Sequence, residues 1–75
     1  MDSDVRSRFE ALRAWRRDRA SEQHVPPYVI FQDKTLLEIA QAEPGDLNSL
    51  GAISGVGQSK LDRYGKGVLE TLNAL

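Results

Sequence analysis

The sequence predicts an all-α fold, a compact orthogonal bundle of about five short helices. Residues Ser3–Gln23 contain no proline or glycine, and apolar side chains recur among them at helical spacing. The run Tyr28–Phe31 has strand propensity, but no second run of this kind exists to pair with it, and an isolated strand is not stable. Proline and glycine divide the rest of the chain into short segments whose apolar residues share one face.

The first predicted helix spans Ser3–Gln23, with an apolar face formed by Val5, Phe9, Leu12 and Trp15. It ends near His24, because Pro26 and Pro27 cannot continue a helix and favour extended backbone before them. We expect Tyr28–Phe31 to form an extended connection or a short helical turn that places apolar side chains against the helices.

Two further helices are predicted before residue 52. Asp33 is expected to be the N-cap of the second helix, which ends before Pro44. The apolar face of this helix is formed by Leu36, Ile39 and Ala40. Asp46 is expected to cap a short third helix that carries Leu47 and Leu50.

Glycines delimit the last two predicted helices. The run Gly55-Val56-Gly57 interrupts the chain and opens a fourth helix from Gln58 to Tyr64. Gly65 is expected to end that helix as a left-handed C-cap. The fifth helix covers Lys66–Leu75, with Val68, Leu69, Leu72 and Leu75 in one apolar stripe.

The chain has 75 residues, which suffice for one small domain and not for two. Residues 1–75 are therefore expected to form a single, monomeric domain around one hydrophobic core. We expect that core to include Phe9, Leu12, Trp15, Ile30, Leu36, Ile39, Leu50, Ile53, Val56, Leu61, Leu69 and Leu72.

The composition excludes several kinds of chemistry. The chain has no cysteine and one histidine, His24, so it offers no disulfide, thiol or cysteine-based zinc site. No serine nucleophile stands in an elbow motif, and the segment after Gly55 is too short for a Walker A loop. We expect no active site, no cofactor and no metal. No apolar run is long enough to cross a membrane, so a cytoplasmic protein is predicted.

The Gly55-Val56-Gly57 break is a candidate phosphate site. N–H groups of the first turn of the following helix point outward there, with the positive end of the helix dipole behind them and Lys60 one turn further on. Helix-hairpin-helix modules use a similar pattern to grip a nucleic-acid backbone. The alternative, of equal weight, is a tight turn whose glycines serve packing alone.

Tyr28 is a candidate base-stacking residue, because it follows two prolines on a connection where helix periodicity does not explain it. An exposed aromatic ring near Lys34 would stack on a single-stranded base while the lysine neutralises a phosphate. Packing of the ring against Pro26 and Pro27 is an equal alternative.

Basic residues also line the first helix. Arg6, Arg13 and Arg17 fall on one strip beside the apolar face, where Glu10 cancels part of their charge. A solvated face with ion pairs between successive turns is the favoured interpretation.

The run Val25–Leu36 reads VPPYVIFQDKTL and the run Gly55–Gly65 reads GVGQSKLDRYG. Together with Leu12–Arg16 they resemble the HRDC (helicase and RNase D C-terminal) domain over nearly the whole chain. Such domains are compact helical bundles appended to RecQ-family DNA helicases, to RNase D-type exonucleases and to some other helicases. The sequence of these two motifs is most similar to that of a bacterial RecQ.

The resemblance implies an accessory, non-catalytic domain, the C-terminal part of a larger ATP-dependent 3′–5′ DNA helicase associated with the bacterial nucleoid. It would modulate binding to single-stranded or branched DNA in replication, recombination and repair. In family members that bind DNA, an aromatic and basic residues around the VPPY loop form the surface, and Tyr28 and Lys34 match those positions. The expected DNA-binding residues are Tyr28, Lys34, Gly55, Gly57, Lys60 and Arg63.

Two alternatives remain. Ten basic against eleven acidic residues leave a formal charge of −1, so no overall positive field draws the chain to DNA. The first alternative is therefore a protein-docking module that presents Asp46, Asp62 and Glu70 to the helicase core of the same protein. It would otherwise belong to an RNase D-type exonuclease.

Overall fold

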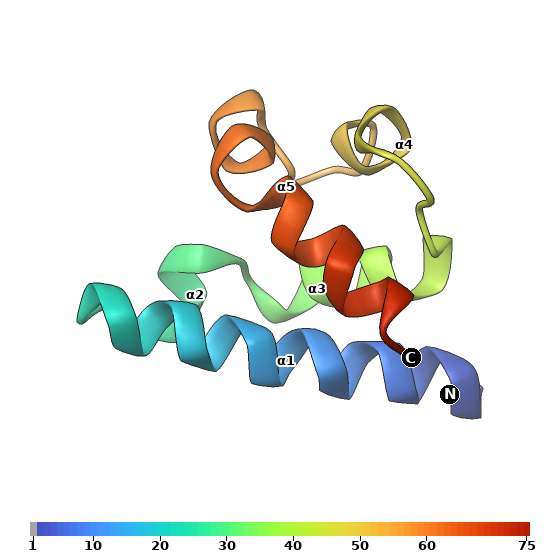
Figure 1. The fold of residues 1–75 in the computed structure, drawn as a ribbon, viewed down its shortest axis with the longest axis horizontal. Coiled ribbons are helices and arrows are strands. Elements are labelled where there is room, and N and C mark those ends of the chain that lie inside the picture. Colours follow the sequence, from blue (N-terminus) through green and yellow to red (C-terminus); the bar gives the residue numbers. More distant parts are fainter. Residues whose placement is uncertain (1) are drawn as a thin grey trace.

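The structure is a computed structural model that describes residues 2–75, and these residues form five α-helices and no strand. The helices are α1 (Ser3–Gln23), α2 (Pro27–Ile30), α3 (Asp33–Ala42), α4 (Leu47–Gly51) and α5 (Gln58–Asn73). Helix α1 runs along one side of the molecule, α2 and α3 lie over it, and α4 and the first half of α5 form the opposite side (Figure 1). The second half of α5 returns towards α1. An all-helical bundle is therefore confirmed.

Helix α1 has the predicted bounds. The Asp2 carboxylate accepts hydrogen bonds from the N–H groups of Asp4 and Val5, which have no partner within the helix. At the other end, His24 adopts a left-handed conformation with φ 57°, and its N–H donates to the carbonyls of Ala20 and Ser21. The prolines that follow make this end sharp. None of the helices in residues 2–75 is both long and apolar enough to cross a membrane.

The segment after the prolines is the short helix α2. Pro27 occupies its first turn, where the missing N–H costs nothing. The backbone becomes extended again at Phe31, and the side chains of Ile30 and Phe31 are buried. The helical-turn alternative is therefore the correct one, and the turn places two apolar side chains in the core.

The predicted N-cap of α3 is wrong by one residue. Gln32 is the cap, and Asp33 is the first helical residue. The Asp33 carboxylate pairs with the Arg16 guanidinium of α1 at 2.7 Å instead of accepting backbone N–H groups. A partner 17 positions away in the sequence therefore determines what this side chain does.

The predicted fourth and fifth helices are one continuous helix, α5, and Gly65 does not end it. Gly65 is buried and has no positive φ. A Cβ atom at this position would lie 2.7 Å from Leu47 Cδ2 and 3.2 Å from Leu61 Cδ1. The glycine thus lets α4 approach α5 closely, and the axis of α5 changes direction between its two halves (Figure 1). The structure still has five helices, as predicted, because Pro27–Ile30, for which the sequence allowed either an extended connection or a helical turn, forms α2.

Two arginines of α1 hold α3 at both of its ends. Arg16 donates to the Phe31 carbonyl at 2.9 Å, in addition to its pair with Asp33. Arg8 donates to the Ala40 carbonyl at 2.6 Å and pairs with Glu43 at 3.0 Å. A cation at the last carbonyls of a helix also complements its dipole. These contacts set the position of α3 along α1.

The predicted core is confirmed. Half of the predicted residues are buried, namely Leu12, Ile30, Leu36, Ile39, Leu50 and Val56, and the other half are partly buried and pack against them. Prediction missed Phe31, Tyr64 and Val68, which are also buried. Phe31, Tyr64 and Trp15 form a cluster with ring centroids 5.8 to 6.2 Å apart. This cluster joins α1, the end of α2 and α5.

Replacing Leu36 by alanine tests the core. Leu36 is completely buried, so we expect Leu36→Ala to lower the free energy of unfolding by about 2–5 kcal/mol. Thermal and urea melts followed by circular dichroism measure the change. Leu75→Ala is the control, because Leu75 is 65% exposed and should change stability by less than about 0.5 kcal/mol. Equal melts for the two variants would contradict this packing.

The cap of α4 gives a pH dependence. The Asp46 carboxylate accepts the Ser49 N–H at 2.7 Å, and this bond, with further bonds to Ser49 and Asn48, lowers the pKa of Asp46 below its usual value of 3.8. The folded state therefore favours the ionised carboxylate. This stabilisation is present when the pH is above the usual pKa of 3.8, and it is lost as the pH falls through the lower pKa of Asp46 in the folded state. We expect Asp46→Ala to lower the Tm at about pH 7 and to differ less from the native chain as the pH falls through the folded pKa of Asp46. Asp46→Asn, which keeps a cap without charge, should lose less at neutral pH.

Candidate nucleic-acid interface

Tyr28 lies on the surface at the start of α2. The residue is 66% exposed, and the neighbouring Val29 is 45% exposed. Pro26 and Pro27 are exposed as well. Large apolar side chains that face water offer surface to a ligand, and a tyrosine ring can stack on a base.

Two contacts bring the start of α5 beside the segment that carries Tyr28 and Lys34. The Lys60 ammonium lies 5.3 Å from the centroid of the Phe31 ring, between α2 and α3. Gly55 packs directly against Thr35, the residue after Lys34. Residues some 25 positions apart in the sequence therefore share one side of the fold.

The two glycines of the turn before α5 differ in role. Gly55 has φ 92°, a conformation that other residues rarely adopt, and a Cβ there would collide with Thr35. Gly57 is the N-cap of α5 with φ −75°, and nothing lies within 4 Å of a Cβ at that position. Between them Val56 is buried. Gly55 thus serves the turn and its packing, whereas Gly57 leaves the first turn of α5 open.

Most arginines of α1 are paired with acidic residues. Ion pairs link Arg8 to Glu43, Arg13 to Glu10, Arg16 to Asp33, Arg17 to Asp18 and Arg19 to Glu22. Among residues 2–75 no ion pair forms at Lys34, Lys60, Arg63, Lys66 or Arg6, all outside that set. The free positive charge therefore lies mostly on α3 and α5.

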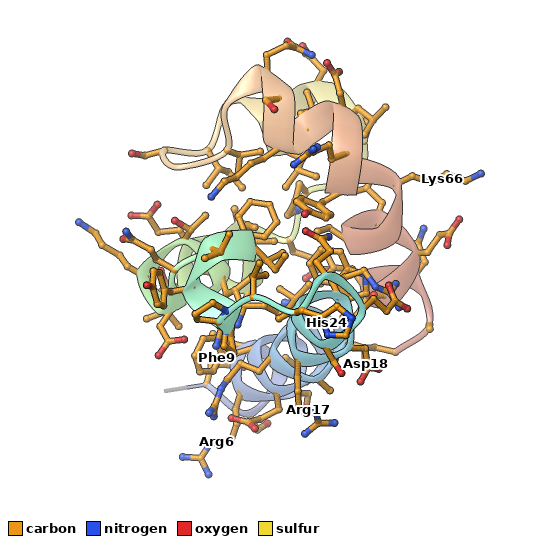
Figure 2. The ribbon with its side chains drawn as sticks, turned by 90° about the vertical axis from the view of Figure 1, so that its left-hand side faces the viewer. Arg6, Phe9, Arg17, Asp18, His24 and Lys66 are labelled. Atoms are coloured by element: carbon orange, nitrogen blue, oxygen red, sulfur yellow. The ribbon has the colours of Figure 1, made fainter. Side chains whose placement is uncertain are left out.

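Three of these free cations, Lys34, Lys60 and Arg63, are predicted site residues. Arg63 lines an open hollow with Gln23 and Tyr64, whose side chains hydrogen bond to each other at 2.8 Å. Lys66 is not among the predicted site residues, and it extends away from the body of the protein (Figure 2). Its spacing of three residues from Arg63 on a helix was the sequence feature that could have indicated a second cation on the same face.

The structure also places the residues considered for other roles. His24 is an exposed C-cap of α1, and the described residues contain no group of three or more His, Cys, Asp or Glu that could hold a metal ion. Of the acidic residues considered for docking, Asp46 caps α4 and Asp62 accepts a hydrogen bond from Gln58. Glu70 is exposed.

The structure is thus a small five-helix domain with an exposed aromatic residue and unpaired cations at two neighbouring turns. Comparison with known proteins shows the family to which this domain belongs. The family model described as the HRDC domain matches residues 5–72. The chain belongs to the HRDC family. The bundle superimposes on D. radiodurans RecQ HRDC domain 3 with a TM-score of 0.86 and 30% identity, covering 96% of this chain and 91% of that one.

Relatives by sequence include two kinds of helicase and a nuclease. The chain is 49% identical over 59 residues to the ATP-dependent DNA helicase UvrD2 of Mycobacterium tuberculosis, and 42% identical over 66 residues to the ATP-dependent DNA helicase RecQ of Bacillus subtilis. It is 37% identical over 67 residues to ribonuclease D of Gluconacetobacter diazotrophicus. The matches cover 79%, 88% and 88% of this chain but only 8%, 11% and 17% of these relatives.

The pair of glycines provides a matched test of the turn. We expect Gly55→Ala to destabilise the fold by about 1–2 kcal/mol from backbone strain, with the collision against Thr35 adding to it. Gly57→Ala should cost less, about 0.5 kcal/mol, because its backbone is ordinary and its surroundings are open, so that only the preference for glycine over alanine at an N-cap is lost. Urea melts of both variants decide this. Similar losses in both would show that the two positions do not differ in role.

Proposed function

We propose that this chain is the accessory DNA-binding domain of a longer ATP-dependent DNA helicase and has no catalytic activity of its own. It binds single-stranded or branched DNA weakly, and so modulates how the parent engages its substrate on the bacterial nucleoid. The observation that carries this proposal is the exposed Tyr28 ring beside segments that hold the unpaired Lys34 and Lys60.

Stacking on Tyr28 supplies the contact to a base. A single-stranded base has a free aromatic face, and stacking on an aromatic side chain is tolerant of sequence. The exposed ring is already presented to solvent on a rigid turn between Pro26 and the buried Ile30. Little conformational entropy is lost when a base binds there.

Cations and N–H groups supply the contacts to the backbone. Lys34, Lys60 and Arg63 are free of competing carboxylates within residues 2–75. The open turn at Gly57 exposes the positive end of the α5 dipole, and Gly55 shapes that turn. These groups are few, and the chain carries a formal charge of −1, so binding is weak and depends strongly on salt.

The parent protein is proposed to be a helicase of RecQ type with 3′–5′ polarity, of which residues 1–75 form one domain. Similarity to both helicases and a ribonuclease D supports an accessory role in either parent. The remaining sequence of the parent discriminates them, because a helicase carries a Walker A loop and an exonuclease carries paired acidic metal ligands.

Fluorescence anisotropy with labelled single-stranded oligonucleotides tests the interface. Tyr28→Ala should weaken binding by about 1–3 kcal/mol if the ring stacks on a base. If about three phosphates are neutralised, the logarithm of the affinity should fall with the logarithm of salt at a slope near −2. The Tyr28→Ala, Lys60→Ala double variant is compared with Arg6→Ala, Leu75→Ala, which also removes one exposed apolar side chain and one unpaired cation, but near the chain termini and away from α2 (Figure 1). Equal affinities of both doubles and the native chain would dismiss this surface.

A second candidate function is docking on the helicase core of the same protein. The slightly acidic chain favours it, since a formal charge of −1 opposes DNA and suits a basic protein surface. Asp62→Lys with Glu70→Lys reverses two of the proposed contacts and leaves the Asp46 cap of α4 intact. Titration against the separately produced core measures the effect, and unchanged affinity would reject docking through these acids.

A further inference from the structure

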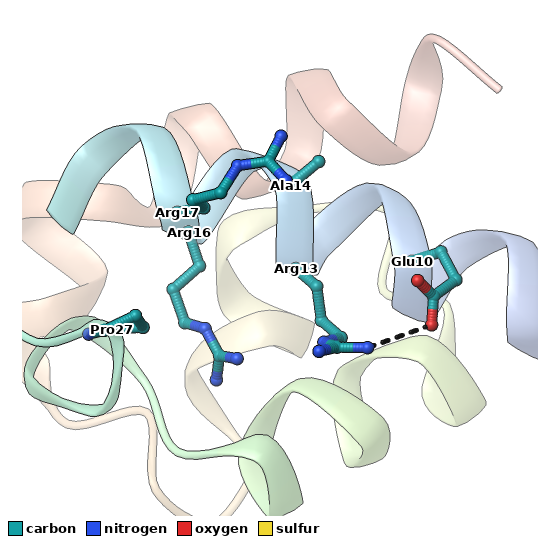
Figure 3. Close-up of a pocket in the computed structure, with 6 residues that line it drawn as sticks. All are labelled: Glu10, Arg13, Ala14, Arg16, Arg17 and Pro27. Atoms are coloured by element: carbon teal, nitrogen blue, oxygen red, sulfur yellow. Dashed lines mark hydrogen bonds and ion pairs between the residues drawn. The ribbon is translucent and has the colours of Figure 1, made fainter. Parts of the chain in front are cut away.

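A cavity of about 290 Å³ lies beside α1, and three arginines line it. Its walls are Glu10, Arg13, Ala14, Arg16, Arg17 and Pro27 (Figure 3). We call this cavity the arginine pocket. The proposed DNA interface on α2, α3 and α5 makes no use of it.

Arg16 is the fixed part of the arginine pocket. Its side chain is only 9% exposed, and it is held by the Asp33 carboxylate at 2.7 Å and the Phe31 carbonyl at 2.9 Å. Its Nε is buried and has no hydrogen-bond partner among residues 2–75. Asp33 is 71% exposed, so water rather than protein solvates much of the charge that opposes Arg16. The pocket therefore has a fixed guanidinium in its wall, whose charge is offset in part by Asp33.

Arg13 and Arg17 are the adaptable parts of the arginine pocket. Arg13 lies 3.3 Å from Glu10, and about half of each side chain is exposed. Arg17 lies 4.0 Å from its neighbour Asp18, with both side chains mostly exposed. Exposed ion pairs of this kind contribute only about 0–1 kcal/mol. Both guanidiniums can therefore leave these carboxylates for a stronger acceptor.

We infer that the arginine pocket binds a backbone phosphate of the DNA strand whose base stacks on Tyr28. This inference rests on the proposed function. Pro27 lines the pocket and directly precedes Tyr28, and neighbouring Cα atoms are about 3.8 Å apart. A nucleotide on the Tyr28 ring thus has its own backbone within reach of the pocket. Guanidinium groups match phosphate oxygens with two parallel hydrogen bonds.

Two of the three arginines reach the pocket from one direction. Arg13 and Arg16 extend from α1 to the same side, towards the segment between α2 and α3, whereas Arg17 extends to the other side past Ala14 and would have to rotate to reach the same phosphate (Figure 3). The guanidinium carbon of Arg13 also lies 5.7 Å from the centroid of the Phe9 ring. The strand would then pass from Lys34 and Lys60 over Tyr28 and onto α1, so α1 extends the interface rather than forming a separate one.

Paired charge-removing variants test the arginine pocket. Arg13→Gln with Arg17→Gln removes two pocket cations and leaves the structural Arg16 intact. Arg6→Gln with Lys66→Gln removes the same charge from side chains that extend away from the pocket (Figure 2). Affinity for a labelled oligothymidylate is measured by anisotropy at several salt concentrations, and melts establish that both variants fold. We expect the pocket variant to bind about 3–10-fold more weakly and to lose about 0.7 from the salt slope, one phosphate contact, while the control changes little.

Each result separates this inference from the proposed function. If the pocket variant binds like the native chain while Tyr28→Ala, Lys60→Ala binds more weakly than the native chain, the inference about the arginine pocket is overturned. The proposed DNA-binding role of the Tyr28 surface is then retained. If the pocket and control variants weaken binding equally, the effect comes from the loss of net positive charge, and the inference about the arginine pocket is again overturned. If the native chain binds no oligonucleotide at low salt, the proposed function fails first and the inference fails with it.

Discussion

The attachment of α1 to both ends of α3 is the constraint on which the rest of the structure depends. Arg8 and Arg16 lie eight residues apart on α1, and between them they reach Ala40, Glu43, Phe31 and Asp33. Fixing α3 in this way places Ile30 and Phe31 in the core and leaves Tyr28 outside it. A mostly buried guanidinium requires partners, because an unpaired buried charge is costly. The Arg16 pair therefore specifies one position of α3, while the apolar core supplies most of the stability.

Close approach of α5 completes the fold around this pair of helices. Gly67 faces the Trp15 indole, where a Cβ would lie 2.9 Å from Nε1, and Gly65 admits Leu47 of α4. The aromatic cluster of Trp15, Phe31 and Tyr64 then forms between α1 and α5. Lys60 lies over one edge of it, with its ammonium group above Phe31. The core packing and the proposed binding surface thus share Phe31, so the surface is positioned by the closely packed core.

Charge distribution explains how a slightly acidic chain can present a basic surface. Five arginines of α1 have carboxylate partners, whereas the lysines of α3 and α5 have none within residues 2–75. Net charge counts all of these groups equally, but a strand on the surface responds to those within about a Debye length, ~10 Å. The exposed arginine pairs are weak and can reorganise. The surface potential therefore depends on which pairs persist when an anion arrives.

The sequence alone determined the class of fold, the bounds of α1, the cap at Asp46 and the twelve predicted core residues, because spacing, proline and capping chemistry act over a few neighbouring residues. The VPPYVIF and GVG motifs also identified the family that residues 5–72 match. Only the tertiary structure decided that Gly65 lies inside one helix, that Asp33 pairs with Arg16 rather than capping α3, and that Tyr64 is buried. Each of these depends on a partner distant in the chain. A glycine can end a helix or admit a neighbouring helix, and only the position of Leu47 distinguishes the two.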